Sequence, residues 1–310
     1  MKSPLISVII AVKNNRATLG KCLDSVLAID YDNYETIVVD DGSTDGTSEA
    51  LKKYSSKIKI ITNTESTGPS AARNSAAHQA EGEFLAFTDG DCIVGSQWLK
   101  ELLSGFDKAD PASVGGRQEL PEDAGDFQKK VFLLMKKIGF ITDYMRAGKD
   151  TIAEVAHNAS CCVMYRKEVF LEMGGFLKGF WPGEDVELDY RLKKKGYRLR
   201  YNPKALVYHY RPDNLKKFSR MMSRYGRAQG FLLRKYGIFR KIQLVPFLSL
   251  GILSALFLYG NFIYLILLVS LVLSWVYLGS FFVLLLCIRA VIFWHLGFIT
   301  GLFKNESPDS

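Results

Sequence analysis

Two aspartates separated by one glycine, Asp89-Gly90-Asp91, follow an apolar run that begins at Phe84. The run has the composition of a buried strand, and unpaired carboxylates at the end of such a strand repel each other and are costly to desolvate. A divalent cation would remove that cost, because Mg²⁺ and Mn²⁺ prefer oxygen ligands and often share them with phosphate and water. The triplet therefore indicates a metal–diphosphate site, although by itself it is equally typical of a solvated Asp-Gly turn.

A second acidic pair, Asp40 and Asp41, ends another predicted strand that begins at Glu35. In open, mostly parallel sheets, ligands bind at the carboxyl ends of the strands. Both acidic pairs fall at such ends, so we expect them to converge on one crevice. Each pair alone could be a turn, but two pairs at matching strand ends favour a ligand site.

A third acidic pair, Glu184-Asp185, follows Trp181-Pro182 and opens a strongly charged helix over residues 186–195. Acidic residues at the start of a helix and lysines at its end suit the helix dipole, so capping alone could explain the pair. The neighbouring tryptophan and proline instead indicate a shaped pocket.

Alternating strands and helices must position these acids. Segments rich in Ile and Val predict strands over residues 5–12, 35–40, 58–62 and 84–88, with helical segments between them. This alternation, with polar loops after the strands, predicts an α/β fold with an open, mostly parallel sheet.

Charge is distributed unevenly along the 310 residues, of which 40 are basic and 32 acidic. Residues 214–305 contain no Asp or Glu but 11 Lys and Arg, so the net charge of +8 belongs to the C-terminal third. A nearly neutral N-terminal part argues against a nucleic-acid-binding protein. Five cysteines without a Cys-x-x-Cys pair argue against a disulfide framework or zinc site, and for a reducing compartment.

The three acidic pairs, in this order and together with Gly68–Asn74 and Gly174-Gly175-Phe176, resemble glycosyltransferase family 2 on a GT-A fold. The resemblance covers residues 4–212 and implies a Rossmann-like catalytic domain, a nucleotide-sugar donor and Mn²⁺ or Mg²⁺. A UDP-sugar is the expected donor, with GDP- and dTDP-sugars as alternatives. The Gln-x-x-Arg-Trp motif of processive members is absent, which implies transfer of a single sugar.

The resemblance also implies a role for individual residues. Asp91 would bind the metal, supported by Asp89, and Asp185, with Glu184 beside it, would be the catalytic base that gives inversion at the anomeric carbon. Such a base contributes roughly 10²–10⁴-fold to the rate. The nucleotide would be bound by Asp40, Asp41, Val12, Asn14, Arg73, Asp89 and Gly90.

Other candidates rest on less specific signals. His209 could be a further metal ligand, although a lone histidine in an aromatic strand is more often structural. Arg73 could approach the diphosphate or the base, or could equally be a helix-surface arginine. We expect Asn158, Arg166 and Trp181 on the acceptor side.

A basic helix is predicted over residues 214–241, where Lys217, Arg220, Arg224, Arg227 and Arg234 share one stripe. No acids alternate with these bases, which favours binding to anionic lipid headgroups over a solvated charged face. Residues 242–303 are almost wholly apolar, enough for two or three transmembrane helices at about 20 residues each. Arg289 lies within them and either faces acceptor phosphate or lies in the membrane interface.

The expected organisation is a catalytic domain over residues 1–213, the basic helix over 214–241, transmembrane helices over 242–303 and a polar tail over 304–310. Basic residues beside the first crossing place the catalytic domain in the cytoplasm of a multi-pass protein of the plasma or inner membrane. The predicted acceptor is a polyprenyl phosphate or diphosphate-linked glycan, in polysaccharide or cell-envelope assembly alongside other glycan-assembly enzymes.

Two rival functions have distinct signatures. A catalytically silent, membrane-tethered nucleotide-sugar-binding protein would bind nucleotide without turnover, and the intact Asp91 and Asp185 speak against it. A sugar nucleotidyltransferase on a related sheet would need a glycine-rich loop after the first strand, where Lys13-Asn14-Asn15 stands instead.

Overall fold

The computed structural model describes residues 3–106, 111–139, 151–259 and 261–303, and structural statements refer to these ranges. The chain forms two compact units. The first comprises the described residues up to Ala124 and from 151 to Tyr210, and the second comprises residues 125–139 and those from Arg211 onward.

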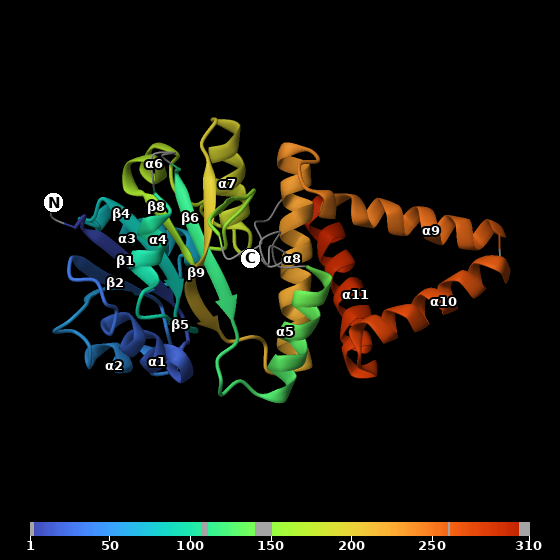
Figure 1. Ribbon diagram of the computed structural model, residues 1–310, viewed down its shortest axis with the longest axis horizontal. Coiled ribbons are helices and arrows are strands. Elements are labelled where there is room, and N and C mark those ends of the chain that lie inside the picture. The colour runs from blue at the N-terminus through green and yellow to red at the C-terminus, as the bar shows by residue number, and fades with distance from the viewer. Residues whose placement is uncertain (1–2, 107–110, 140–150, 260, 304–310) are drawn as a thin grey trace. The chain divides into compact units, whose positions relative to one another are not determined.

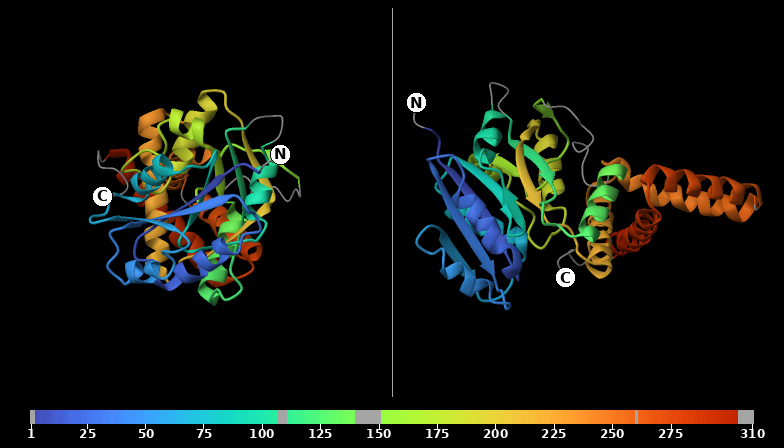
Figure 2. Two further views of the ribbon diagram at one scale, coloured as in Figure 1. Left: turned by 90° about the vertical axis from the view of Figure 1, so that its left-hand side faces the viewer. Right: turned by 60° about the horizontal axis from the view of Figure 1, so that its bottom comes forward.

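The first unit is built on a nine-stranded sheet in the order β3-β2-β1-β4-β8-β6-β9-β5, with β7 paired to β9 (Figures 1 and 2). Strands β1 to β4 are mutually parallel, β8 runs antiparallel to β4 and β6, and β5 runs antiparallel to β9. The strands are β1 (Ile6–Val12), β2 (Tyr34–Asp41), β3 (Lys59–Asn63), β4 (Phe84–Asp89), β5 (Cys92–Val94), β6 (Ser113–Glu119), β7 (Ala153–Glu154), β8 (Val163–Arg166) and β9 (Leu199–His209).

Helices cover both faces of this sheet because its strands are apolar on both sides. In β1, Ile6, Val8 and Ile10 face one core and Ile9 faces the other, as the two-residue period of a strand requires. The first core includes α1 (Arg16–Leu27), α2 (Thr47–Lys52) and α4 (Trp98–Ser104). The second includes α3 (Pro69–Gln79), α6 (Lys167–Glu172) and α7 (Glu184–Lys194). The α/β fold with a mostly parallel sheet is thereby confirmed.

Strand β9 contains an irregularity in its pairing with β6. It is continuous from Leu199 to His209, and its pairing with β6 shifts after Gly116, where Asn202 is the last partner before Leu206. Pro203 lies in this irregularity, and a proline has no N–H to donate to a ladder, so it is tolerated at a bulge. The shift lets β9 continue to His209, which reaches the site described below.

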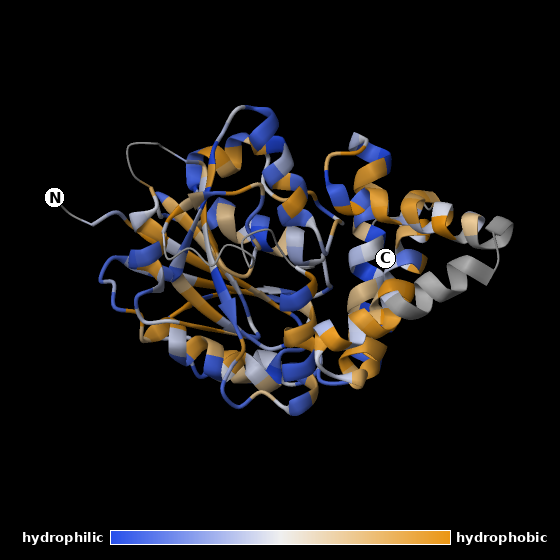
Figure 3. Cartoon of the chain, turned by 45° about the vertical axis from the view of Figure 1, so that its right-hand side comes forward, coloured by the Kyte–Doolittle hydropathy of each residue, from blue (hydrophilic) through white to orange (hydrophobic). Residues whose placement is uncertain are grey.

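The second unit consists of helices α5 (Asp126–Ile138), α8 (Leu215–Tyr236), α9 (Val245–Tyr259), α10 (Asn261–Leu278) and α11 (Phe281–Phe303), with a 3₁₀ turn over Lys241–Leu244. In Figure 3 the cartoon of α8 carries both hydrophilic and hydrophobic colours, whereas α11 is mostly in hydrophobic colours. Among the described residues, α11 is the one helix both long and apolar enough to cross a membrane. The structure therefore gives no support to a multi-pass arrangement.

Helices α8 and α11 pack with their backbones in contact at four glycines. A Cβ atom at Gly226 would lie 1.9 Å from the carbonyl oxygen of Trp294, and one at Gly297 would lie 1.9 Å from that of Ser223. Gly230 and Gly301 are equally constrained, by Phe298 and Arg227. Each helix thus contributes a Gly-x-x-x-Gly pair, which permits close approach of two helices. The basic helix is consequently bound along one side to α11 rather than being isolated.

Candidate active site

The register of the sheet brings two of the acidic pairs to the end of β1. Val12 lies opposite Asp40 of β2, and Ala11 lies opposite Asp89 of β4. Because the three strands are parallel, both acidic pairs emerge at the same edge of the sheet. This is the edge at which ligands bind in open α/β sheets.

The turn Asp89-Gly90-Asp91 leads directly into β5, whose pairing with β9 places Cys92 opposite His209. The His209 Nε2 atom lies 3.4 Å from Asp91 Oδ1. One ligand atom from each of Asp89, Asp91, Cys92 and His209 lies within 4.8 Å of the others. Two carboxylates and an imidazole form a donor set that fits Mn²⁺ or Mg²⁺, so these residues could hold the metal that the sequence predicted.

Gly90 is required at this turn for a steric reason. A Cβ atom at this position would lie 2.7 Å from Cγ1 of Val12, and the Gly90 carbonyl accepts a hydrogen bond of 2.9 Å from Thr18 Oγ1. Val12 itself is buried at the end of β1. Gly90 and Val12 therefore shape the Asp89-Gly90-Asp91 turn through packing.

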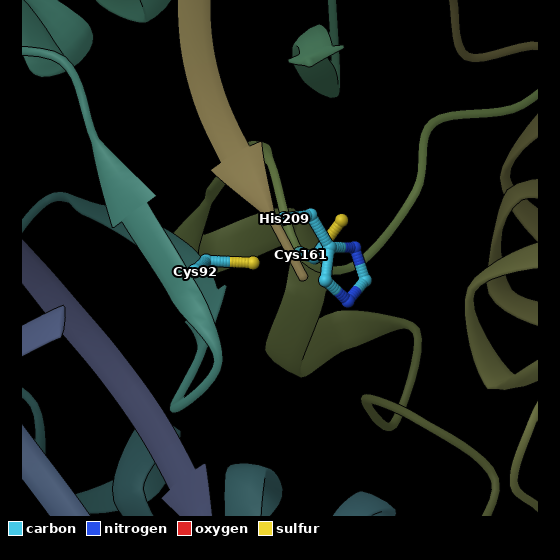
Figure 4. A group of neighbouring side chains, drawn as sticks. All are labelled: Cys92, Cys161 and His209. Atoms are coloured by element: carbon cyan, nitrogen blue, oxygen red, sulfur yellow. The ribbon is translucent and has the colours of Figure 1, made fainter. Parts of the chain in front are cut away.

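Two thiols beside the Asp89-Gly90-Asp91 turn were not anticipated from sequence. Cys92, Cys161 and His209 also bring their ligand atoms within 4.8 Å of one another, and Figure 4 shows the Cys92 thiol directed toward the other two. Both cysteines are buried. Thiolates suit softer metals such as Zn²⁺, so His209 is shared by a carboxylate set and a thiol set. Sequence spacing gave no signal because Cys161 comes from a distant segment.

Arg73 connects the aspartate turn to the third acidic pair. Its Nη2 lies 2.5 Å from Asp89 Oδ1, and its Nη1 lies 2.8 Å from Glu184 Oε1. Burial opposes its charge, yet the carboxylates of Asp89 and Glu184 raise the pKa of Arg73 above its ordinary value. Only 2% of Arg73 is exposed, so the surface alternative is wrong and the residue holds two acidic elements together.

Glu184 is buried beneath the site. It accepts hydrogen bonds from Arg73 and, at 3.0 Å, from Ser160 Oγ. Burial and the neighbouring Asp185 carboxylate raise the pKa of Glu184, against the opposing effect of Arg73. With 1% exposure it does not face an acceptor, which corrects its assignment as a catalytic residue: it positions Arg73 and the start of α7.

Asp185 remains partly accessible at the N-terminus of α7, with 14% of its side chain exposed. Its Oδ2 accepts a hydrogen bond of 3.0 Å from the Ser160 N–H, and its Oδ1 accepts one of 2.7 Å from the Val186 N–H. Each carboxylate oxygen thus has one backbone donor and a further lone pair, which fixes the orientation of the group while leaving it able to accept a proton.

His157 lies between two acids of α7 and was missed by the sequence analysis. Its Nε2 is 3.9 Å from Asp185 Oδ2, and its Nδ1 is 3.0 Å from Asp189 Oδ2. Asp189 is buried and also accepts hydrogen bonds from the Asn158 N–H and the Tyr165 hydroxyl. Burial raises the pKa of Asp189. The four-residue spacing of Asp185 and Asp189 on one helix face was the available signal.

Asp41 organises the loop between β3 and α3. Its two oxygens accept five hydrogen bonds of 2.7–2.9 Å, from Asn63 Nδ2, Ser66 Oγ, the Thr67 N–H and hydroxyl, and the Gly68 N–H. Burial opposes ionisation, but these donors outweigh it and lower the pKa of Asp41. A carboxylate so fully engaged fixes the loop that leads to Arg73. Its predicted contact with a nucleobase stays a prediction.

Asp40 and Asn14 organise the loop after β2 in a similar way. Asp40 accepts hydrogen bonds from the Ser43 N–H, at 3.1 Å, and from the Ser48 hydroxyl. Asn14, with a positive φ of 56°, accepts a hydrogen bond of 2.8 Å from the Thr44 N–H. Both residues lie at the predicted nucleotide-binding edge, where they shape the backbone.

The structure corrects two acceptor-side predictions and locates two others. Asn158 is fully buried and donates to Ser113 Oγ and the Arg200 carbonyl. Arg166 pairs with Phe84 at the start of β4, the opposite end of that strand from Asp89, and its guanidinium lies over the Phe84 ring. Trp181 is half-buried and lies three positions before Glu184, the first residue of α7, and its place on the acceptor side stays a prediction. Arg289 belongs to α11 of the second unit.

Comparisons with known proteins point to one family. The model described as glycosyl transferase family 2 matches residues 7–174, and that of glycosyl transferase family group 2 matches residues 91–298. The glycosyltransferase AglE of Haloferax volcanii is 30% identical over 258 residues, which cover 81% of this chain and 82% of the relative. A second relative, from Methanococcus voltae, is 28% identical over 273 residues, covering 84% of this chain and 83% of its own. It is named dolichyl N-acetyl-alpha-D-glucosaminyl phosphate 3-beta-D-2,3-diacetamido-2,3-dideoxy-beta-D-glucuronosyltransferase.

A solved structure shares the fold along almost the whole chain. The mannosyltransferase PcManGT from Pyrobaculum calidifontis, in complex with GDP-Man and Mn²⁺, superposes with a TM-score of 0.68 at 17% identity. The match covers 98% of this chain and 89% of that chain.

Proposed function

The chain belongs to glycosyl transferase family 2, and we propose that it moves a single sugar from a nucleotide-sugar donor to a lipid-linked acceptor, with inversion at the anomeric carbon. It is a glycosyltransferase by family, which argues against the nucleotidyltransferase. The silent binding protein is separated from it by the transfer assay below. The observation that carries the proposal is the bridge from Arg73 to both Asp89 and Glu184, because it joins the metal-binding turn to the element bearing Asp185.

In the proposed reaction, the residues near Asp89 would bind the leaving diphosphate, and Asp185, next to Glu184, would activate the acceptor. A divalent cation held by Asp91 and His209, with Asp89 beside them, would neutralise negative charge on the departing nucleoside diphosphate. Asp185 would accept the proton of the acceptor hydroxyl, since its carboxylate is oriented by Ser160 and Val186. Asp40 and Asp41 would keep the loops around the nucleotide in place.

A lipid-linked acceptor is supported by the relatives and by the second unit. The Methanococcus voltae enzyme is named for a dolichyl phosphate-linked substrate. Helix α11 exposes one apolar side, including Leu285, Ile292 and Leu296, of which 46%, 51% and 55% are exposed. Such a surface suits lipid, and the absence of acids in residues 214–305 suits an anionic cytoplasmic membrane face. We place the catalytic unit in the cytoplasm, attached through α11.

The test is transfer by the full chain in lipid nanodiscs. Radiolabelled UDP-, GDP- and dTDP-sugars would each be offered with Mn²⁺ and either a polyprenyl phosphate-linked sugar, which carries the acceptor hydroxyl, or a soluble oligosaccharide. We expect one donor to label the lipid, with loss of transfer on chelation. Labelling of the soluble acceptor alone would contradict the lipid assignment, and no labelling despite nucleotide binding would contradict the activity.

A further inference from the structure

A basic pocket lies between α8 and α11, wholly within the second unit. It has a cavity volume of about 650 Å³. Five of its lining residues are cationic, and none of those described is acidic. These cations are Lys216, Arg220, Arg224, Arg227 and Arg289.

Helical periodicity gathers these cations on one face of α8. Lys216, Arg220, Arg224 and Arg227 recur at intervals of four, four and three residues, which superimposes them along a helix. Lys217, which the sequence assigned to this stripe, instead forms an ion pair of 2.8 Å with Asp213. The four α8 cations that line the pocket therefore lie on the part of the α8 surface that borders α11.

Arg289 is the most informative member because α11 carries no other Asp, Glu, Lys or Arg. A charge in the centre of an apolar helix is expensive in a membrane and usually marks a functional contact. Its Nε donates a hydrogen bond of 2.6 Å to Ser219 Oγ, and its guanidinium carbon lies 4.8 Å from the centre of the Phe293 ring. The guanidinium of Arg289 is thus held at its Nε edge by Ser219 and on one face by the ring of Phe293.

This arrangement leaves the edge of the Arg289 guanidinium that carries the two terminal amino groups available to a ligand. Within the described chain, the two terminal amino groups of Arg289 make no hydrogen bond, and neither Lys216 nor Arg220 has a carboxylate partner. A planar guanidinium with two parallel N–H groups matches the geometry of a phosphate. Lys216, Arg220 and Arg289 therefore favour a ligand that carries negative charge.

We propose that the pocket binds the phosphate or diphosphate group of the lipid-linked acceptor. The inference rests on the proposed function and adds a binding site for the acceptor headgroup. Exposed apolar side chains of α11, Ile288 and Ile292, flank Arg289 along the sequence, so the same helix offers apolar contacts to the attached chain. The phosphate chemistry is shared by polyprenyl phosphates, ordinary anionic lipids and free diphosphate, which the experiment separates.

The experiment measures binding of the full chain to nanodiscs containing polyprenyl phosphate, neutral polyprenol, or phosphatidylglycerol at equal charge, and to free diphosphate. We expect polyprenyl phosphate to bind most tightly. Arg220→Gln and Arg289→Gln should each weaken it about tenfold or more, because each removes a charge-assisted contact with phosphate. Arg289→Lys should recover only part of the loss, since lysine lacks the planar fork.

Lys235→Gln is the matched control, an exposed cation of α8 outside the pocket, and should change binding less than twofold. Arg220 is exposed, so its variant tests the pocket even if Arg289→Gln fails to fold. The proposal would be overturned if Lys235→Gln lost as much binding as the pocket variants did. It would also be overturned if phosphatidylglycerol bound as tightly as polyprenyl phosphate, or if free diphosphate bound more tightly. Donor hydrolysis serves as an independent readout of the first unit. If the wild type hydrolyses donor and transfers to lipid while the variants keep their acceptor KM, the pocket assignment fails and the proposed function stands.

Discussion

The two units handle charge in opposite ways. In the first unit, the acids of the candidate active site are neutralised largely from within: Arg73 serves Asp89 and Glu184, and backbone donors serve Asp41 and Asp185. In the second unit, cations line a pocket in which no described residue is acidic. The acids of the first unit are thus paired before a ligand arrives, whereas Lys216, Arg220 and Arg289 of the second unit have no carboxylate partner among the described residues.

The largest effect should come from removing the proposed base. Asp185→Asn keeps the size of the side chain and one of its two backbone hydrogen bonds but cannot take the acceptor proton, so transfer should fall roughly 10²–10⁴-fold. Donor binding, followed by thermal shift with nucleoside diphosphate and Mn²⁺, should persist. Equal losses of binding and transfer would show that Asp185 is structural.

Arg73→Gln should break the internal neutralisation of the first unit. It leaves Asp89 and Glu184 without their buried partner, and breaking a buried ion pair typically costs about 3–5 kcal/mol. Urea denaturation would measure this loss. Lys100→Gln is the matched control, because its ion pair with Asp30 is exposed and its loss should cost far less. Similar losses for both variants would contradict the special position of Arg73.

Gly297→Val should separate the helices that form the basic pocket. The new side chain would meet the Ser223 carbonyl, and overpacking of this kind costs about 1–3 kcal/mol. Gly251→Val of α9 is the control, since a Cβ there meets nothing within 4 Å. Native-state proteolysis of α8 should become faster only in the first variant. If both variants resist proteolysis equally, the α8–α11 contact is not needed for the pocket.

Asp41→Asn should give the smallest loss and a characteristic pH dependence. The amide replaces an acceptor oxygen by a donor facing other donors, which costs about 1–3 kcal/mol. The pKa of Asp41 is lowered from 3.8, so the stability it contributes is present above that value and is lost as the pH falls through the folded pKa. The difference between wild type and variant should therefore be full at pH 7 and shrink below about pH 4. A constant difference would show that ionisation of Asp41 is irrelevant.

The sheet and its acidic edge could be predicted from sequence because the signals are local. Runs of Ile and Val define β1 and β2, and Asp89-Gly90-Asp91 follows a strand directly. His157 and Cys161 could not be found in this way, since they meet their partners only through the folded chain. Arg166 was misplaced because its sequence neighbourhood did not show that β8 runs antiparallel to β4.

The second unit was harder to predict for a related reason. Composition identified a basic helix and an apolar segment, but not the glycine contacts that align them. The position of Arg289 against Ser219 depends on those contacts, so its orientation could not be read from helix periodicity alone.

Mn²⁺ binding is the most direct test of the claim that distant acids meet around one cation. Electron paramagnetic resonance titration of the full chain should detect one tight Mn²⁺ per chain in the presence of nucleoside diphosphate. Asp91→Ala and His209→Ala should abolish or strongly weaken it, while Asp185→Asn should retain it. Unchanged Mn²⁺ affinity in both Asp91→Ala and His209→Ala would contradict the account.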